Sequence, residues 1–372
     1  MNAIHTLATT LSTGTPQTAA GLTLVPLLRR TPARLAFLGF AEALKRSLVE
    51  VTELGPGGSV PEVSVLNRGE LPVLFLDGEA LVGAKQNRVL NLSVLVPGKA
   101  TTTIPVSCVE AGRWSPRSRA FVDGESLHFA KARACKVANV SEAMAQGMGR
   151  RSNQGAVWDA MDDYLADFDA AAPSRAMQDG YAKVQHTVDD LLGKLPALDG
   201  QAGAAFLLHG KLLGIDLMGS AEAFAEIHAK IVRSYAVEAL RGGPSASSDP
   251  GAAPAGGVVD DIAAESVRQA LAELATASWQ QHPAIGLGTD LRLSAPGWDA
   301  AALVVDEELV HLAAFPRTRP ASMSSRKQAP AFAVSETLQR LAHPERTFAA
   351  RRALAAAFVR VKLGDVRQGL DD

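Results

Sequence analysis

The sequence predicts an α+β protein with an antiparallel, β-rich core, arranged as a sandwich or a single sheet, and with helices flanking it. Short apolar runs separated by turn residues fill residues 48–109, a pattern typical of antiparallel strands joined by short loops. Apolar residues at helical spacing dominate from about residue 154, and further strand-like runs occur at 204–218 and 301–315. Strands are therefore expected in both halves of the chain.

The composition favours a large folded core and argues against a nucleic-acid partner. The chain has 372 residues, of which 47% are hydrophobic and 20% are charged, so it can bury one large core or two moderate ones. With 37 Lys+Arg against 39 Asp+Glu, the formal charge is -2. That balance provides no global field to attract nucleic acid or an anionic membrane.

Neither a secretory signal nor a membrane-spanning helix is predicted. The first twenty residues contain no Lys or Arg, and no run approaches 18 uninterrupted apolar residues. The two cysteines, Cys108 and Cys135, are expected to be free thiols, because a chain of this size gains little from a single disulfide. We therefore expect a cytoplasmic protein with no membrane attachment.

The first half of the chain is expected to contain mainly strands. A strand at 22–28 precedes a helix at 33–47, and the strands that follow are predicted at 48–54, 60–66, 72–76, 80–83, 89–96 and 101–109. Asp77-Gly78 predicts a two-residue type I′ turn, because such a turn needs positive φ at both positions. Residues 110–155 are expected to form surface loops with short helical pieces at 126–134 and 141–148.

The second half is expected to alternate helices and strands. Helices are predicted at 154–168, 174–192, 221–240 (with Ser220 as N-cap), 262–281 and 344–362, and strands at 204–209, 212–218, 285–293, 301–305 and 309–315. Residues 317–327 are expected to form a polar loop. Residues 242–258 lack large apolar side chains before their final valine and are expected to form a flexible insertion.

These elements suggest a division of the chain into two parts. A β-rich domain at 20–155 carries the polar motif described next, and a mixed α+β part at 156–372 contains the insertion at 242–258. The two parts can also form one continuous domain.

Polar residues crowd the ends of two predicted strands. Arg88 shares the parity of Leu90 on one strand, and Cys108 and Glu110 share that of Val106 on the other. If the strands pair through the turn at Pro97-Gly98, these ends form one rim. The candidate ligand-binding residues at this rim are Lys85, Gln86, Asn87, Arg88, Arg113 and Trp114.

Two interpretations of the rim remain open. It can bind a planar or anionic ligand, because arginine supplies a bidentate fork, the amides supply polar edges and Trp114 supplies a stacking face. Alternatively, a buried Arg88–Glu110 pair braces the end of the sheet, with Cys108 as a small core residue. If the site is catalytic, the candidates are Glu110, as a general base whose pKa is raised by apolar surroundings, and Cys108, as a nucleophile.

A second flank is expected near the start of the helix at 154. Arg151 and Gln154 can help to hold an anion at the helix N-terminus, or they belong to a solvated loop. Asp159, Asp162 and Asp163 lie at helical spacing, which suits a divalent cation, but a solvated acidic helix face is the favoured interpretation. The histidines and cysteines lack zinc spacing, so no metal site is predicted and the cofactor is left unknown.

The motifs resemble those of one protein family. Lys-Gln-Asn-Arg at 85–88 and Cys-Val-Glu-x-Gly-Arg-Trp at 108–114 occur together, and QGAVWDAM at 154–161 and the segment 216–240 extend the similarity over most of the chain. The chain resembles the bacterial ADP-ribosylglycohydrolase and rhodanese-phosphatase associated domain family. The resemblance implies a role near NAD or ADP-ribose metabolism, although the family name describes gene neighbourhood rather than a reaction.

We therefore expect the protein to bind a nucleotide-like or phosphorylated metabolite, related to NAD or ADP-ribose, at the rim. One alternative is a hydrolase or transferase that acts on an ADP-ribose-type substrate through Glu110 or Cys108. Another is a structural or partner-binding protein without a ligand.

Overall fold

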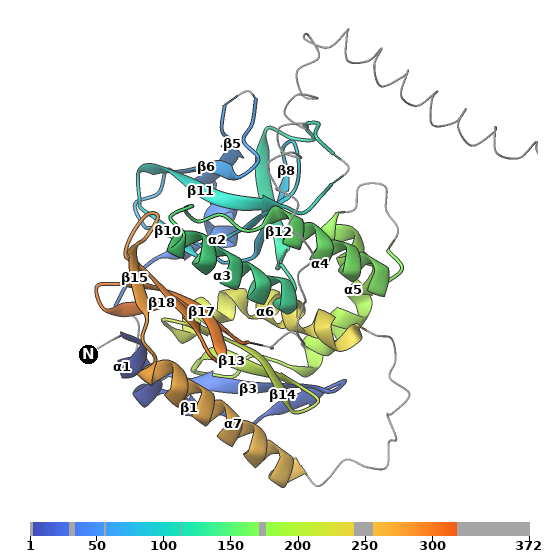
Figure 1. Ribbon diagram of the computed structural model, residues 1–372, viewed down its shortest axis with the longest axis vertical. Coiled ribbons are helices and arrows are strands. Elements are labelled where there is room, and N and C mark those ends of the chain that lie inside the picture. The colour runs from blue at the N-terminus through green and yellow to red at the C-terminus, as the bar shows by residue number, and fades with distance from the viewer. Residues whose placement is uncertain are drawn as a thin grey trace, which may run out of the picture. The chain divides into compact units, whose positions relative to one another are not determined.

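A closed β-barrel, two further sheets and the helices packed on them make up the described part of the chain (Figure 1). This computed structural model describes residues 3–29, 34–55, 57–111, 113–170, 176–241 and 256–317. All of them belong to one compact unit. The predicted α+β class, with antiparallel sheets, strands in both halves and flanking helices, is confirmed.

The barrel is formed by strands whose apolar residues alternate with polar ones. On one of them, Val63 and Val65 are buried while Glu62 is exposed and Ser64 is partly so, so one face fills the barrel. The strands pair in the order β11-β6-β5-β12-β8-β9, all antiparallel. Their bounds are β5 (Val49–Glu53), β6 (Glu62–Asn67), β8 (Glu79–Gly83), β9 (Arg88–Leu90), β11 (Ala100–Cys108) and β12 (Ala120–Leu127).

A small sheet lies against the barrel and breaks one predicted strand in two. Its strands are β4 (Leu38–Gly39), β7 (Val73–Phe75) and β10 (Val94–Val96), in the order β10-β7-β4. The strand expected at 89–96 is divided into β9 and β10, because Asn91 and Ser93 hydrogen-bond outside any strand ladder. The expected pairing with the strand at 101–109 therefore holds for β9 only.

The turn at Asp77-Gly78 is not of type I′. Gly78 has a φ of 79°, whereas Asp77 does not have a positive φ. Glu79 N donates to Leu76 O at 3.1 Å, but β7 and β8 belong to different sheets, so the turn does not close a hairpin. The type I′ prediction is wrong because Asp77 places its side chain in a buried ionic cluster, described below, instead of a hairpin tip.

The large sheet gathers strands from both ends of the described chain. Its order is β1-β3-β13-β14-β18-β17-β16-β15, with β2 paired to β3. The strands predicted at 22–28, 204–209, 212–218, 301–305 and 309–315 are confirmed, whereas the one expected at 285–293 is replaced by β15 and β16. The bounds are β1 (Ser12–Thr13), β2 (Gln17–Ala19), β3 (Leu22–Leu28), β13 (Gln201–Leu208), β14 (Lys211–Met218), β15 (Gln280–Pro283), β16 (Thr289–Ala295), β17 (Trp298–Val305) and β18 (Glu308–Pro316).

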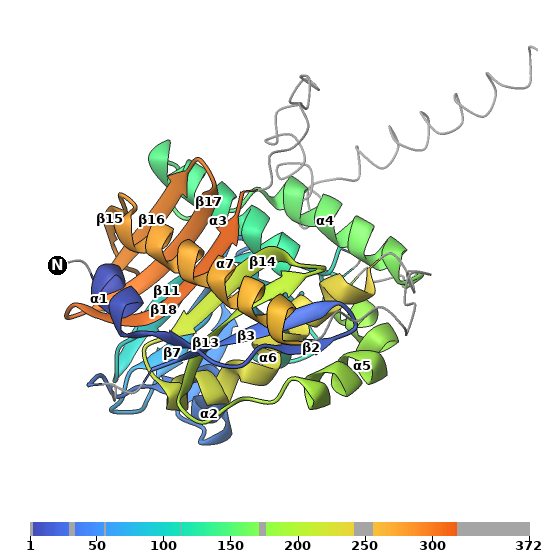
Figure 2. The same cartoon turned by 90° about the horizontal axis from the view of Figure 1, so that it is seen from below.

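Helices cover both faces of the large sheet (Figures 1 and 2). On the barrel side, α3 (Ala130–Ala145) and α6 (Ala221–Leu240) pack on the sheet, and α4 (Gln154–Asp167) and α5 (Met177–Lys194) pack beside them. On the opposite face, α7 (Gly256–Thr276) and α1 (Ala3–Thr10) pack together, and α7 contributes to a separate apolar core. The short helix α2 (Phe40–Lys45) packs on the barrel. Each described helix is too short or too polar to cross a membrane.

The structure matches the predicted helices to different extents. Helix α6 and its Ser220 cap are confirmed, since Ser220 Oγ accepts a hydrogen bond from Ala223 N at 3.1 Å. The helix expected at 33–47 is reduced to α2. The two helical pieces expected within 110–155 are one helix, α3, whose buried Arg133 and Lys136 interrupt the apolar pattern that would have predicted it. The helix expected at 344–362, residues 318–327 of the expected polar loop and residues 242–255 of the expected insertion lie outside the described residues.

Candidate functional site

Part of the predicted rim lies at one end of the barrel. Arg88 lies opposite Cys108 in the register of β9 and β11. Alternate residues of a strand point to the same face. Leu90, two positions after Arg88, and Val106, two positions before Cys108, belong to the barrel core, so Arg88 and Cys108 also point into the end of the barrel. Glu53, at the end of β5, reaches Arg88. We call Glu53, Lys85, Arg88, Cys108 and Trp114 the barrel mouth.

Arg88 is fully buried there, and two of its nitrogens make no hydrogen bond to a described residue. Its Nη1 donates to Gln86 Oε1 at 2.7 Å, while Nη2 is 3.8 Å from Glu53 Oε1, too far for a hydrogen bond. Among the described residues, Nε and Nη2 of Arg88 and Oε2 of Glu53 have no hydrogen-bond partner. Since nearly all buried polar atoms in proteins are paired, this arrangement suits an additional polar molecule.

Trp114 forms the outer wall of the barrel mouth. Its side chain is 40% exposed, and its ring centre lies 5.4 Å from the Arg88 guanidinium and 5.7 Å from Lys85 Nζ. Lys85 Nζ also donates to Gly57 O at 2.6 Å, and Lys85 N donates to Glu53 Oε1 at 3.2 Å. The mouth thus combines an aromatic face, two cations and a carboxylate.

Cys108 lines the mouth as a protonated thiol. Burial raises its pKa to about 11, and the nearby Arg88 guanidinium only partly offsets that rise. Its backbone is held by Gln154, whose Oε1 accepts from Cys108 N at 3.0 Å and whose Nε2 donates to Cys108 O at 2.9 Å. Gln154 therefore fixes the end of β11.

Glu110 and Arg113 brace the chain beside the mouth. Arg113 Nε and Nη2 donate to the two Glu110 carboxylate oxygens at 2.9 and 2.6 Å. Arg113 also donates to the carbonyl oxygens of Ala84 and Ser115 at 2.6 and 2.8 Å. Burial acts to raise the pKa of Glu110, but hydrogen bonds from Arg113 and the Asn87 amide outweigh it, and the pKa lies below its ordinary value. The expectation of a raised pKa is therefore wrong, and Glu110 pairs with Arg113 instead of Arg88.

Gln86 and Asn87 belong to the same brace. Gln86 Nε2 donates to the backbone oxygen of Glu110, and Asn87 Oδ1 accepts from Arg113 Nη2 at 3.1 Å. Asn87 Nδ2 also donates to Gln178 Oε1 at 3.2 Å, which links the brace to α5. Their amides hold the strand ends in place.

The second predicted flank, before α4, does not show the predicted anion site at the helix N-terminus. Arg151 is exposed, and Asn153 caps the helix by accepting from Ala156 N at 3.2 Å. Asp159, Asp162 and Asp163 lie on the exposed side of α4. Among the described residues, no group of three or more His, Cys, Asp or Glu is placed to hold a metal ion.

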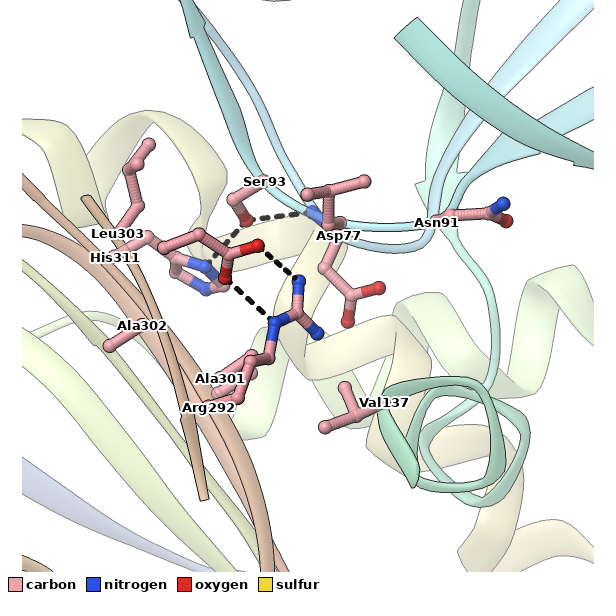
Figure 3. Close-up of a pocket in the computed structure, with 12 residues that line it drawn as sticks. Asp77, Asn91, Ser93, Val137, Arg292, Ala301, Ala302, Leu303 and His311 are labelled. Carbon is pink, nitrogen blue, oxygen red and sulfur yellow. Dashed lines mark hydrogen bonds and ion pairs between the residues drawn. The ribbon is translucent and has the colours of Figure 1, made fainter. Parts of the chain in front are cut away.

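A second group of polar residues, which the sequence analysis did not single out, lines a pocket between the barrel side and the large sheet (Figure 3). Its cavity volume is about 10 Å³, room for about one water molecule. Asp77 and Ser93 line it from the barrel side, and Arg292 and His311 from the large sheet. We call it the interface pocket. Ligand sites are often found where two structural parts meet.

A chain of hydrogen bonds runs from this pocket into the core. Ser93 Oγ is 2.8 Å from His311 Nδ1 and accepts from Asp77 N at 2.9 Å (Figure 3). His311 Nε2 is 3.4 Å from Asp216 Oδ1. The Ser93 hydroxyl, the His311 ring and the Asp216 carboxylate therefore form a continuous chain of contacts.

Asp216 is held as a carboxylate despite full burial. Arg133 donates to both of its oxygens, at 3.1 and 2.6 Å, and Tyr235 OH donates to Oδ2 at 2.7 Å. Burial acts to raise the pKa of Asp216, but the Arg133 charge and the hydrogen bonds from His311 and Arg133 hold it well below its usual range.

Further cations surround the interface pocket. Arg292 is 2% exposed, and its Nε and Nη2 donate to Asp290 at 2.7 and 3.1 Å. Its Nη1 has no hydrogen-bond partner among the described residues. Lys136 Nζ lies 3.2 Å from Asp77 Oδ1, and burial lowers the pKa of Lys136.

A sequence signal for this pocket did exist. Asp216 and His311 each interrupt an apolar strand, in LLGIDLM and LVHLAAF, and Asn91 and Ser93 interrupt another. A polar residue on a buried strand face needs a partner, so such interruptions mark candidate sites.

The chain was compared with known proteins. The model of one family, described as the ARG and Rhodanese-Phosphatase-superfamily-associated Protein domain (ARPP-1), matches residues 10–315. None of the curated proteins and none of the solved structures with which the chain was compared matched it.

Proposed function

The chain belongs to the ARPP-1 family, and we propose that it binds a planar, nucleotide-like or phosphorylated metabolite at the barrel mouth. The observation that carries this proposal is a set of buried atoms, Nε and Nη2 of Arg88 and Oε2 of Glu53, that have no hydrogen-bond partner among the described residues. They offer two donors and one acceptor on side chains that lie 3.8 Å apart. A nucleobase or carboxamide edge presents the complementary groups.

Trp114 supports the planar part of the proposal. Its ring covers Arg88 and is 40% exposed, and exposed side chains change rotamer within nanoseconds. Rotation of the ring uncovers the guanidinium and leaves an aromatic face for a base to stack on. Lys85 is the cation that we propose to contact a phosphate.

NAD and ADP-ribose are the ligand class that we propose to test first. The alternative, a hydrolase or transferase that uses Glu110 or Cys108, has less support. Glu110 is held as a carboxylate by Arg113, and the raised pKa of Cys108 keeps its thiol protonated at neutral pH. Such a thiol is a weak nucleophile.

Isothermal titration calorimetry with NAD, ADP-ribose, AMP, glucose 6-phosphate and inorganic phosphate tests the proposal. We expect at least one nucleotide to bind and Trp114→Ala to weaken its binding roughly 5- to 150-fold, the equivalent of one lost stacking contact. Arg88→Lys, which keeps the positive charge but removes the planar guanidinium and its paired donors, is expected to weaken binding as well.

Met148→Ala is the matched control. Met148 is a comparably exposed apolar residue, 55% against 40% for Trp114, in the turn after α3. It is expected to leave binding unchanged. Absence of binding by all five compounds, or equal binding by Trp114→Ala and wild type, contradicts the proposal.

A further inference from the structure

We propose that Ser93 and His311, which line the interface pocket (Figure 3), form a catalytic site with the buried Asp216 behind them and hydrolyse small esters carrying a negative charge. This activity is independent of the barrel-mouth ligand. It uses residues of the Asn91–Ser93 bend and of strands β14 and β18, none of which belongs to the barrel mouth.

The hydrogen bonds direct the serine proton toward the histidine. Asp77 N–H donates to Ser93 Oγ, so the hydroxyl proton of Ser93 is left to donate to His311 Nδ1, 2.8 Å away. Because Nδ1 then accepts, the proton of the neutral ring sits on Nε2, which faces Asp216 Oδ1 at 3.4 Å. Nucleophile, base and orienting carboxylate thus follow one another as in serine hydrolases, with the two ring nitrogens exchanged.

Asp216 acts as a positioning residue. Arg133 donates to both oxygens of its carboxylate, and Tyr235 donates to Oδ2, so the carboxylate is held in place. It therefore holds one ring tautomer and balances the charge of the imidazolium that forms when Ser93 gives up its proton.

The charges around the pocket select the substrate. Arg292 lines the pocket, and its Nη1 has no hydrogen-bond partner in the described part of the chain. Lys136 contacts Asp77, another lining residue. These donors suit an anionic group on the substrate. With its side chains as they lie, the pocket has room for about one water molecule, so an ester enters only when the lining side chains move apart.

The reaction proceeds in two balanced steps. In the first, His311 Nδ1 takes the Ser93 proton, Oγ bonds to the ester carbonyl carbon, the bond to the leaving oxygen breaks, and that oxygen takes the proton from His311. In the second, a water molecule gives a proton to His311 and bonds to the acyl carbon. The bond to Ser93 Oγ breaks, and Oγ recovers the proton.

Covalent labelling of the full chain with a fluorophosphonate tests the nucleophile. Peptide mass spectrometry of the labelled wild type is expected to place the adduct on Ser93. His311→Gln should slow labelling by about 100-fold, the effect of losing a general base. Ser234→Ala is the control, because its buried hydroxyl donates to the His128 carbonyl and not to an imidazole ring, and labelling should stay unchanged. No adduct, or an adduct elsewhere, overturns the proposal, whether or not Ser93→Ala folds.

Turnover of paired esters tests the charge preference. 4-Acetoxybenzoate, which carries a carboxylate, should be hydrolysed at least about 10-fold faster than phenyl acetate, and Arg292→Gln should remove that preference while hydrolysis of phenyl acetate persists. Equal rates for the two esters in the wild type overturn the assignment of an anionic substrate.

Nitrogen-15 chemical shifts of His311 test the role of Asp216. The wild type should show its ring proton on Nε2, and Asp216→Asn should lower that tautomer's population together with the labelling rate. A proton on Nδ1 in the folded wild type overturns the relay, because Nδ1 then has no lone pair to accept the Ser93 proton.

Discussion

Arg133 and Asp216 form a bidentate ion pair in which neither side chain is exposed. Arg133 Nη2 lies 2.6 Å from Asp216 Oδ1, and Nη1 lies 3.1 Å from Oδ2. Arg133 comes from α3 and Asp216 from β14, while Asp77, before the barrel strand β8, lies 3.3 Å from Arg133 Nε. One guanidinium therefore joins helix, large sheet and barrel side.

Removal of this guanidinium should be costly. Arg133→Met leaves the Asp216 carboxylate buried without its main partner, and we expect a loss of about 3–5 kcal/mol in the free energy of unfolding, measured in urea. Arg268→Met is the control, because Arg268 pairs with Glu265 on the surface, with side chains 52% and 70% exposed. A surface pair contributes at most about 1 kcal/mol. Similar losses in the two variants would contradict the linking role.

The brace around Glu110 should give a pH-dependent contribution to stability. Since its pKa is lower in the folded than in the unfolded state, the Arg113 pair stabilises the fold above the ordinary carboxyl value near 4.5. That contribution is lost as the pH falls through the folded-state value. The stability difference between wild type and Glu110→Gln should therefore be largest near pH 7 and shrink below about pH 4.5.

Chemical denaturation across this pH range makes the measurement. Glu70→Gln serves as the control, because Glu70 pairs with Lys99 on the surface and its side chain is 84% exposed. Its effect should be small at every pH. A stability difference for Glu110→Gln that grows toward low pH would contradict the assigned direction.

The two cysteines should differ in reactivity. Cys135 is exposed and Cys108 is buried, so iodoacetamide at pH 8 should alkylate Cys135 in the folded protein and Cys108 only on unfolding. Mass spectrometry of the digested protein distinguishes the two sites. Rapid alkylation of Cys108 in the native state would instead support its role as a nucleophile.

The same thiol should destabilise the fold at high pH. Its pKa rises from an ordinary value of 9.0 to about 11 in the folded protein, so the unfolded state loses the proton first. Relative to Cys108→Ala, the wild type should lose stability between about pH 9 and 11, at about 1.4 kcal/mol per pH unit. Equal dependence of stability on pH in the two proteins would contradict the raised pKa of Cys108.

Two glycines should respond oppositely to alanine. A Cβ at Gly98 would overlap the backbone oxygen of Glu70, whereas a Cβ at Gly193, in α5, meets no atom within 4 Å among the described residues. We expect Gly98→Ala to destabilise by about 1–3 kcal/mol and Gly193→Ala to stabilise by about 0.5–1 kcal/mol. Thermal unfolding measures both, and tolerance of Gly98→Ala would show that the adjoining loop can move.

Local patterns were enough to predict many elements. The strand at 22–28 and the helix at 221–240 have the predicted bounds, because each has an uninterrupted apolar pattern and clear ends. Closure of the barrel could not be predicted, since it depends on pairing β12 with β5 and β8 across long stretches of chain. Helix α3 was missed as one element because its buried face carries Arg133 and Lys136.

In the candidate sites, too, contacts between neighbouring strands could be predicted, whereas contacts between distant parts of the chain could not. Strand parity correctly placed Arg88 beside Cys108, because both lie on neighbouring strands. Glu53 was not identified, since its strand lies earlier in the chain and carries no polar cluster. Ser93 and His311 are 218 positions apart, and only the tertiary fold brings them within hydrogen-bond distance.

The pairing of β3 with β13 has a consequence for biosynthesis. β3 ends at Leu28, and β13 begins at Gln201, so about 170 residues separate two strands that lie side by side. At a ribosomal rate of about 5–20 residues per second, β3 waits roughly 10 to 35 s for this partner strand. During that interval the barrel strands between them are already synthesised, while the edge of β3 that pairs with β13 stays without its native partner.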